Sequence, residues 1–96
     1  MDSDNQIIIP ESFIALFVLP GRSKPTEPYR TVLQRYELCE DLACALVDRA
    51  TTKKWELGVE TQDIVQRIGL GLAGTDAGLS ALEAEWVCKR LTELMG

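Results

Sequence analysis

In the segment from Pro28 to Leu57, four carboxylates are the side chains best placed for chemistry. They are Glu37, Glu40, Asp41 and Asp48. On a helix, Glu37 and Asp41 would share one face, where like charges are slightly destabilising, and we expect Arg35, Arg49 or a partner's cation to relieve the repulsion. Paired carboxylates can transfer protons or hold Mg²⁺, but both roles need a cavity, and the metal usually needs substrate phosphates. We therefore interpret these carboxylates as a solvated acidic face.

The residue types that are missing exclude several kinds of active site. The 96 residues include no His, which removes Ser/His and Cys/His nucleophiles and most catalytic zinc sites. The stretch Gly69–Gly74 matches G-x-G-x-x-G, but it closes a predicted helix and no strand precedes it, so it does not indicate a dinucleotide site. A close approach by the long helix that we predict over Pro28–Leu57 explains the glycines of this stretch better. We expect no catalytic residue, no metal site and no cofactor.

Basic residues cluster at one place in an acidic chain. Ten Lys and Arg stand against fifteen Asp and Glu, which gives a net charge of −5, and Arg22, Lys24 and Arg30 form the only basic cluster. They lie on or next to a Pro/Gly-rich loop, and loops run over the surface. The cluster either serves solubility alone or docks an acidic partner or a phosphate. We predict Arg22, Lys24 and Arg30 as partner-binding residues.

The two tryptophans, Trp55 and Trp86, have two interpretations. A core or half-buried position is the commoner one for each. An exposed tryptophan at a helix end is instead a typical hot spot of a protein interface. We include Trp55 among the predicted partner-binding residues on the second interpretation.

The cysteines and the N-terminus indicate the compartment. Cys39, Cys44 and Cys88 are odd in number and are not spaced as a disulfide framework, and on one helix Cys39 and Cys44 would lie about 140° apart. We expect three reduced core cysteines.

The N-terminus is acidic where a secretory signal is basic, and Phe13–Leu19 is far shorter than the ~20 residues of a membrane span. We expect a cytoplasmic protein without membrane or nucleic-acid partners, since duplex binding depends on Lys and Arg.

The elements that position these residues are helices. Ser80 and Glu83 form a capping box, which predicts a helix over Ala81–Met95 with Ala84, Val87, Leu91, Leu94 and Met95 on its apolar stripe. A helix over Thr61–Ala73 would bury Ile64, Val65, Ile68 and Leu72. Pro10–Val18 is predicted as a short helix rather than a strand, residues 1–9 as an extended or disordered arm, and Leu19–Thr26 and Gly74–Gly78 as loops. The sequence thus predicts one all-α domain over residues 1–96, a small bundle of three main helices plus a short N-terminal helical segment.

The longest periodic stretch runs from Pro28 to Leu57 and ends before Gly58, which can take the left-handed position after a helix. Its apolar stripe is Val32, Tyr36, Cys39, Ala43, Leu46, Val47 and Ala50. Thirty helical residues span ~45 Å, whereas a compact chain of this length is only about 32 Å across. Either the helix breaks near Thr51-Thr52, or its end carries Trp55 into a partner. We predict a continuous helix.

Short segments across nearly the whole chain resemble a family of small uncharacterised bacterial helical proteins. They are Ile9-Pro10, Ser12–Leu16, Pro20–Arg22, Pro25, Glu40–Ala43, Gly58-Val59, Glu83-Ala84, Trp86-Val87, Arg90-Leu91 and Glu93-Leu94. Some members of that family carry the label of an ATPase with chaperone activity. This chain has no phosphate loop, no Walker-type acid at a strand end and too few residues for a nucleotide-binding core, so the resemblance implies association with such a machine rather than the activity itself.

These observations lead to a first hypothesis and two alternatives. The first is a non-enzymatic interaction or regulatory module that binds another protein, or itself as a homodimer. The second is an enzyme or a small-molecule or metal binder that uses the helix carboxylates, with or without Cys39 or Cys88. The third is an acidic regulator of a nucleic-acid enzyme, whose surface mimics nucleic acid.

Overall fold

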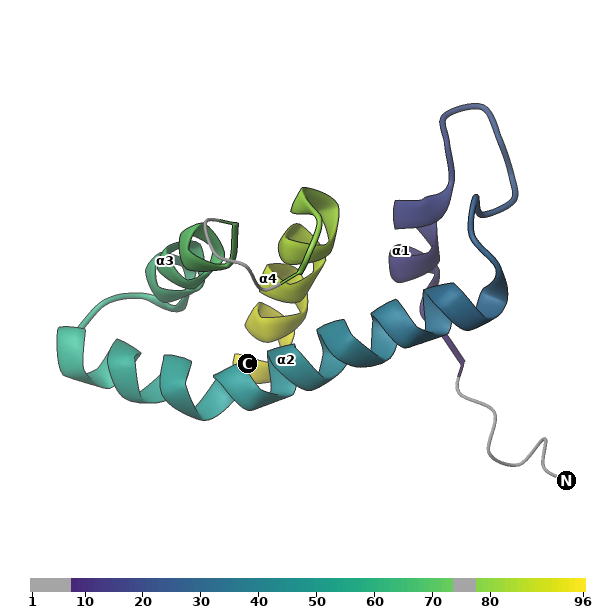
Figure 1. Cartoon of the computed structure of the whole chain (residues 1–96). Helices are drawn as coiled ribbons and strands as arrows, with labels where there is room; N and C mark the ends of the chain where they lie inside the picture. Colours follow the sequence, from purple (N-terminus) through teal and green to yellow (C-terminus); the bar gives the residue numbers. More distant parts are fainter. Residues whose placement is uncertain (1–7, 74–77) are drawn as a thin grey trace, which may run out of the picture. The chain divides into compact units, whose positions relative to one another are not determined.

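The described residues fold mainly into helices (Figure 1). The computed structural model describes residues 8–73 and 78–96. They contain α1 (Glu11–Ile14) with the 3₁₀ turn η2 (Ala15–Phe17), α2 (Tyr29–Leu57), α3 (Thr61–Ala73) and α4 (Ala81–Met95). These described residues form no strand, and only an isolated bridge joins Val18 and Pro25. The predicted all-α class, with three main helices and a short N-terminal one, is confirmed.

The contacts within the chain divide it into two compact units, and α2 belongs to both. The first unit ends at Glu37 and the second runs from Leu38 to Gly96. The prediction of one domain over residues 1–96 stays a prediction. Residues 1–7 of the predicted arm lie outside the described residues, whereas Ile9 is buried.

The first unit is organised around Phe13, which is fully buried. The ring of Phe13 lies 5.5 Å from that of Phe17 and packs edge to face on Tyr36 at 5.6 Å, an arrangement that aromatic quadrupoles favour. The Pro10 carbonyl accepts hydrogen bonds from the amides of Phe13 and Ile14, which starts the short helix. The helix expected over Pro10–Val18 is thus confirmed over Glu11–Phe17, where its second half is a 3₁₀ turn.

The long helix α2 is continuous, as predicted, and does not break near Thr51-Thr52. It begins at Tyr29, one residue after Pro28. The Pro28 carbonyl accepts a hydrogen bond from the Val32 amide, so Pro28 directly precedes the first turn of the helix. It ends at Leu57, and the next residue, Gly58, has a φ of +65° and donates its amide to the Lys54 carbonyl at 2.9 Å. Among the described helices, none has both the length and the apolar character that crossing a membrane requires.

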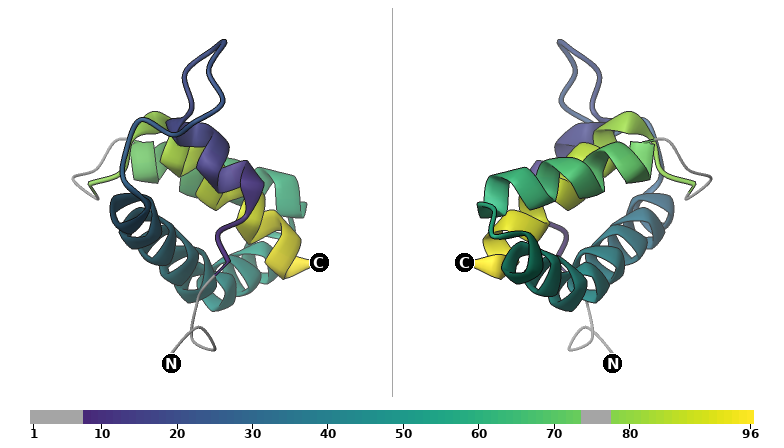
Figure 2. Two further views of the ribbon diagram at one scale, coloured as in Figure 1. Left: turned by 90° about the vertical axis from the view of Figure 1, so that its right-hand side faces the viewer. Right: turned by 90° about the vertical axis from the view of Figure 1, so that its left-hand side faces the viewer.

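In the second unit α3 and α4 lie side by side (Figure 2), and side chains of the C-terminal part of α2 pack against them. Its core consists of Ala50, Ile64, Val65 and Leu91, with Leu46, Val47, Val59, Ile68, Cys88 and Met95 partly buried against it. The predicted capping box begins α4: the Glu83 amide donates to Ser80 Oγ at 3.1 Å, and the Ser80 amide donates to Glu83 Oε1 at 2.9 Å. The apolar stripe of α4 packs inward as expected, with Ala84, Val87 and Leu91 buried. The expected burial on α3 is confirmed for Ile64 and Val65, whereas Ile68 and Leu72 are only partly buried.

The glycines inside α3 have different surroundings. A Cβ on Gly69 would lie 2.7 Å from Cys88 Sγ, so the helix that approaches Gly69 closely is α4. The expectation that the long helix makes this approach is wrong. A Cβ on Gly71 would meet no atom within 4 Å, so no packing within the described chain explains that glycine.

None of the three cysteines forms a disulfide, but they do not all belong to the core. Cys39 is buried and Cys88 is half-buried, whereas Cys44 is exposed. The expectation of a core position is therefore wrong for Cys44. The physical reason is helix geometry, because a residue five places after the buried Cys39 points about 140° away from it.

Candidate functional site

The predicted basic cluster is exposed, and the structure brings part of it together. Arg22 and Lys24 line a hollow of about 300 Å³ formed by the loop from Leu19 to Thr26. Arg30 lies in the first turn of α2 and is not among the residues that line this hollow. The loop is held by the Thr26 amide, which donates to the Phe17 carbonyl at 2.7 Å. Partner binding by this cluster stays a prediction.

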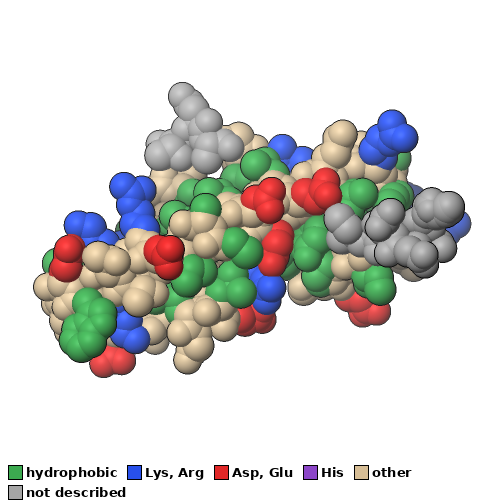
Figure 3. Space-filling model, turned by 90° about the horizontal axis from the view of Figure 1, so that it is seen from below, with side chains coloured by type: hydrophobic (Ala, Val, Ile, Leu, Met, Phe, Trp, Pro, Cys, Tyr) green, Lys and Arg blue, Asp and Glu red, His purple; other side chains and the backbone are tan. Residues whose placement is uncertain are grey.

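The two tryptophans occupy opposite environments. Trp86 is buried in α4, whereas Trp55 is 83% exposed near the end of α2. The prediction of a core or half-buried position is thus confirmed for Trp86 and wrong for Trp55. Trp55 comes five residues after the buried Ala50, so on the helix it points about 140° away from Ala50. Trp55 lines a shallow hollow of about 430 Å³ with Thr51, Lys54, Gly58 and Val59. Near the end of α2, hydrophobic side chains reach the surface beside charged ones (Figure 3).

A hollow of the second unit forms a groove between α2 and α3, with a volume of about 550 Å³. A short connection after Gly58 joins the two helices (Figure 1). Apolar side chains and one glycine form most of its lining: Leu46, Leu57, Ile64, Ile68, Gly71 and Leu72. On each helix the lining residues recur at three- and four-residue spacing, which places them on one face. We call this feature the α2–α3 groove.

Three cations complete the lining of the α2–α3 groove: Arg49, Lys53 and Arg67. The expectation that the loop holds the only basic cluster is therefore wrong. Lys53 Nζ lies 3.5 Å from Glu56 Oε1 in an exposed ion pair, which contributes little. Arg49 and Arg67 make no ion pair with any residue that the structure describes. No carboxylate lines the groove, so it presents positive charge on an acidic chain.

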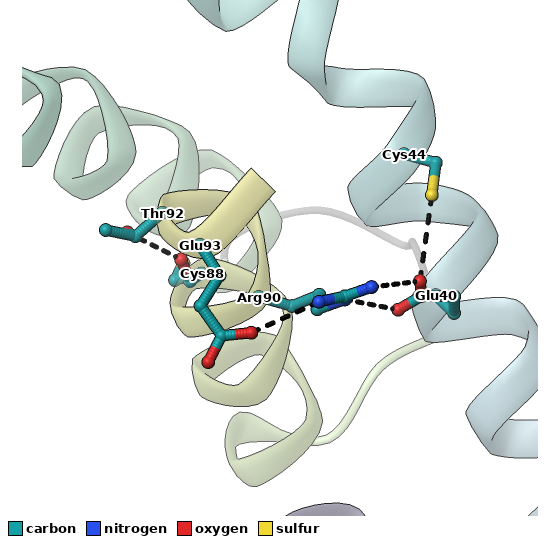
Figure 4. Close-up of polar contacts among 6 residues, drawn as sticks. All are labelled: Glu40, Cys44, Cys88, Arg90, Thr92 and Glu93. Carbon is teal, nitrogen blue, oxygen red and sulfur yellow. Dashed lines mark hydrogen bonds and ion pairs between the residues drawn. The ribbon is translucent and has the colours of Figure 1, made fainter. Parts of the chain in front are cut away.

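The α2 carboxylates do not line that groove, and one of them has a structural partner (Figure 4). Arg90 of α4 donates to Glu40 of α2 through Nε at 2.8 Å and through Nη2 at 2.9 Å, a bidentate pair. Arg90 also pairs with Glu93 at 3.2 Å, and Cys44 Sγ donates weakly to Glu40. The hydrogen bonds from Arg90 lower the pKa of Glu40 and outweigh its partial burial. Glu40 is therefore an ionised link between α2 and α4.

The other carboxylates of this segment, Glu37, Asp41 and Asp48, are exposed. Arg49 was expected to neutralise carboxylates of its own helix, but it lines the α2–α3 groove instead. Among residues 8–73 and 78–96, no group of three or more His, Cys, Asp or Glu side chains is placed to hold a metal ion.

Cys88 is the half-buried thiol of the second unit. Burial raises its pKa, and the negative charge of Glu85 raises it further. The thiol donates weakly to the Val65 carbonyl, with a distance of 3.9 Å. Since the thiolate is the reactive form, Cys88 is a poor nucleophile at neutral pH.

Comparison with protein-family models, with curated proteins and with solved structures finds no match to this chain. The resemblance to the bacterial helical family therefore stays a prediction. The functional proposal below depends on the geometry and charge of the described residues.

Proposed function

We propose that this protein is a non-enzymatic interaction module that binds another protein through its second unit. The observation that carries the proposal is the α2–α3 groove, where an apolar floor lies open next to Arg49 and Arg67, neither of which is neutralised by a described residue. Covering apolar surface is the main favourable term in protein association. A partner that covers this floor would gain that term and could also pair with the arginines.

Trp55 supports the same proposal from a second position. Its side chain is 83% exposed, and Leu57 on the same turn is 50% exposed. Tryptophan is enriched among the residues that contribute most to protein interfaces. Binding of a second copy of the chain remains the alternative within this proposal.

We favour this function over an enzyme that uses the α2 carboxylates. Glu40 is the least exposed of those carboxylates, and its charge is already paired with Arg90. Cys88, the half-buried thiol, has a raised pKa that opposes nucleophilic chemistry. We also propose a cytoplasmic location, because none of the three cysteines forms a disulfide and persistent disulfides belong to oxidising compartments.

Site-specific photo-crosslinking in cells tests the proposal. Leu57 lines the α2–α3 groove and is 50% exposed, while Leu82 in the first turn of α4 is 51% exposed and does not line it. A benzophenone amino acid replacing Leu57 should give a discrete adduct, and the same replacement at Leu82 should give none. The adduct's mass distinguishes another protein from a second copy. Equal labelling from both positions, or no adduct from Leu57, would contradict a binding role for the groove.

A further inference from the structure

The shape of the α2–α3 groove indicates the kind of segment that fits it. Its lining runs from Leu46 to Leu57 on α2 and from Ile64 to Leu72 on α3, or about 17 Å and 12 Å at 1.5 Å per residue. About three turns of a helix have that length. Grooves that bind proline-rich segments are lined by aromatic rings, and extended peptides add to sheet edges. This groove has no aromatic lining residue, and the described residues form no strand that could offer an edge.

The charge of the groove indicates the polar face of that segment. Arg49, Lys53 and Arg67 all line the groove together with the apolar residues, and no carboxylate does. Opposite charges across an interface raise the association rate and select the partner. A nucleic acid would also bring negative charge, but single strands bind on aromatic stacking platforms, and the lining has none.

Gly71 provides an independent observation. Glycine inside a helix costs about 1 kcal/mol relative to alanine, so its presence calls for a reason. At Gly69 that reason is Cys88, but at Gly71 a Cβ would meet no atom within 4 Å, and Gly71 lines the groove. The bare backbone at this point would allow a bound helix to approach α3 closely.

We propose that the α2–α3 groove binds an acidic amphipathic helix of another protein. Its apolar face packs on Leu46, Ile68 and Leu72, and its carboxylates pair with Arg49 and Arg67. This inference rests on the proposed function and adds the chemistry of the partner.

A synthetic peptide tests the inference directly. The probe is a fluorescein-labelled, end-capped helix of about four turns, with Leu on one face and Glu on the other, titrated with the protein at low salt. Its fluorescence anisotropy should show saturable binding, and binding should weaken as salt screens the charges. A scrambled peptide of the same composition should not bind. Equal binding of both peptides would overturn the inference.

Charge variants of the protein locate the binding. Arg49→Glu with Arg67→Glu should weaken peptide binding by at least about tenfold, because attraction becomes repulsion at both positions. The matched control uses single changes: Arg67→Glu should weaken binding, whereas Lys89→Glu makes the same change of net charge at an exposed position of α4 outside the groove lining and should bind as the wild type does. An equal loss in both single variants would show that only the total charge matters and would overturn the inference.

A further variant separates binding from folding. Gly71→Leu fills the groove without meeting another described atom near its Cβ, so it should raise the melting temperature. It should nevertheless weaken peptide binding by about tenfold. Undiminished binding would contradict a helix that lies close to α3 at Gly71.

The remaining outcomes distinguish this inference from the proposed function. A Leu57 adduct without peptide binding would leave the interaction module standing and overturn the acidic helix. A dimer in sedimentation that Arg49→Glu with Arg67→Glu dissolves would also overturn it, because the occupant would be a second copy. Binding to phosphatidylglycerol vesicles through Arg49 and Arg67, without binding of the peptide, would likewise overturn the acidic helix as the occupant.

Discussion

Replacing Gly69 and Gly71 separately by alanine should affect stability in different ways, although both glycines lie in the same helix. Alanine improves helix propensity by about 1 kcal/mol at either position. At Gly71 that gain is retained, because the new Cβ meets no atom within 4 Å. For a domain of this size, a gain of 1 kcal/mol raises the melting temperature by about 4–8 °C.

At Gly69 the same substitution has an opposing cost. The new Cβ would lie 2.7 Å from Cys88 Sγ, whereas ordinary van der Waals contacts of a Cβ are 3.4–4 Å long. Forcing α3 and α4 apart, or turning the thiol, costs about 1–3 kcal/mol. Gly69→Ala should therefore be less stable than Gly71→Ala by about that amount, and at best as stable as the wild type.

Urea denaturation measures this difference. Trp86 is buried in α4, so its fluorescence follows the unfolding of this unit, and an unchanged m-value would show that the unfolded states are alike. Cys88→Ala should recover the loss in the Gly69→Ala background and should leave the effect of Gly71→Ala unchanged, because of the two glycines only Gly69 lies against the sulfur. If Gly69→Ala stabilises the protein as much as Gly71→Ala does, the reasoning about the α3–α4 approach is refuted.

Further predictions concern the helix cap, the interhelical ion pair and the exposed tryptophan. Ser80→Ala removes the cap of α4 and should cost about 1 kcal/mol in urea unfolding, while no loss would mean that the capping box contributes nothing. Arg90 lowers the pKa of Glu40 in the folded chain below the ordinary value of 4.5. The pair therefore stabilises the fold fully when the pH is above 4.5, and this stabilisation is lost as the pH falls below that value. Glu40→Gln should therefore cost about 1 kcal/mol at pH 7, and its deficit in chemical denaturation should shrink as the pH falls below 4.5; a constant deficit would contradict the link. Trp55→Phe should remove most of the emission that acrylamide quenches, whereas Trp86→Phe should leave it, and the reverse result would show that Trp55 is covered.

The helices could be predicted because their signals are local. The capping box at Ser80 defines the start of α4, and Gly58 defines the end of α2 through a backbone conformation that glycine adopts without strain. The buried stripe of α3 follows from apolar residues at three- and four-residue spacing. Each of these signals depends on residues within one or two turns of one another, so one sequence is enough to recognise them.

The candidate site depended on distances that no local pattern encodes. Arg49 and Arg67 belong to different helices, and only the packing of α2 on α3 brings them to one groove. Glu40 and Arg90 are 50 positions apart, so nothing in the sequence joins them. Gly71 was a signal for the groove in the sequence, but the sequence does not show what it means. Only the structure shows that Gly69 packs against α4, whereas no described residue packs against Gly71.

The sequence by itself determined that this protein is acidic, lacks histidine and folds into helices, because composition and local periodicity are properties of the chain. The tertiary structure alone decided that Trp55 is exposed while Trp86 is buried, and that cations meet apolar side chains between α2 and α3. The physical reason is that burial and charge proximity depend on which helix faces pack together. That packing is settled by the whole set of competing apolar contacts rather than by any one segment.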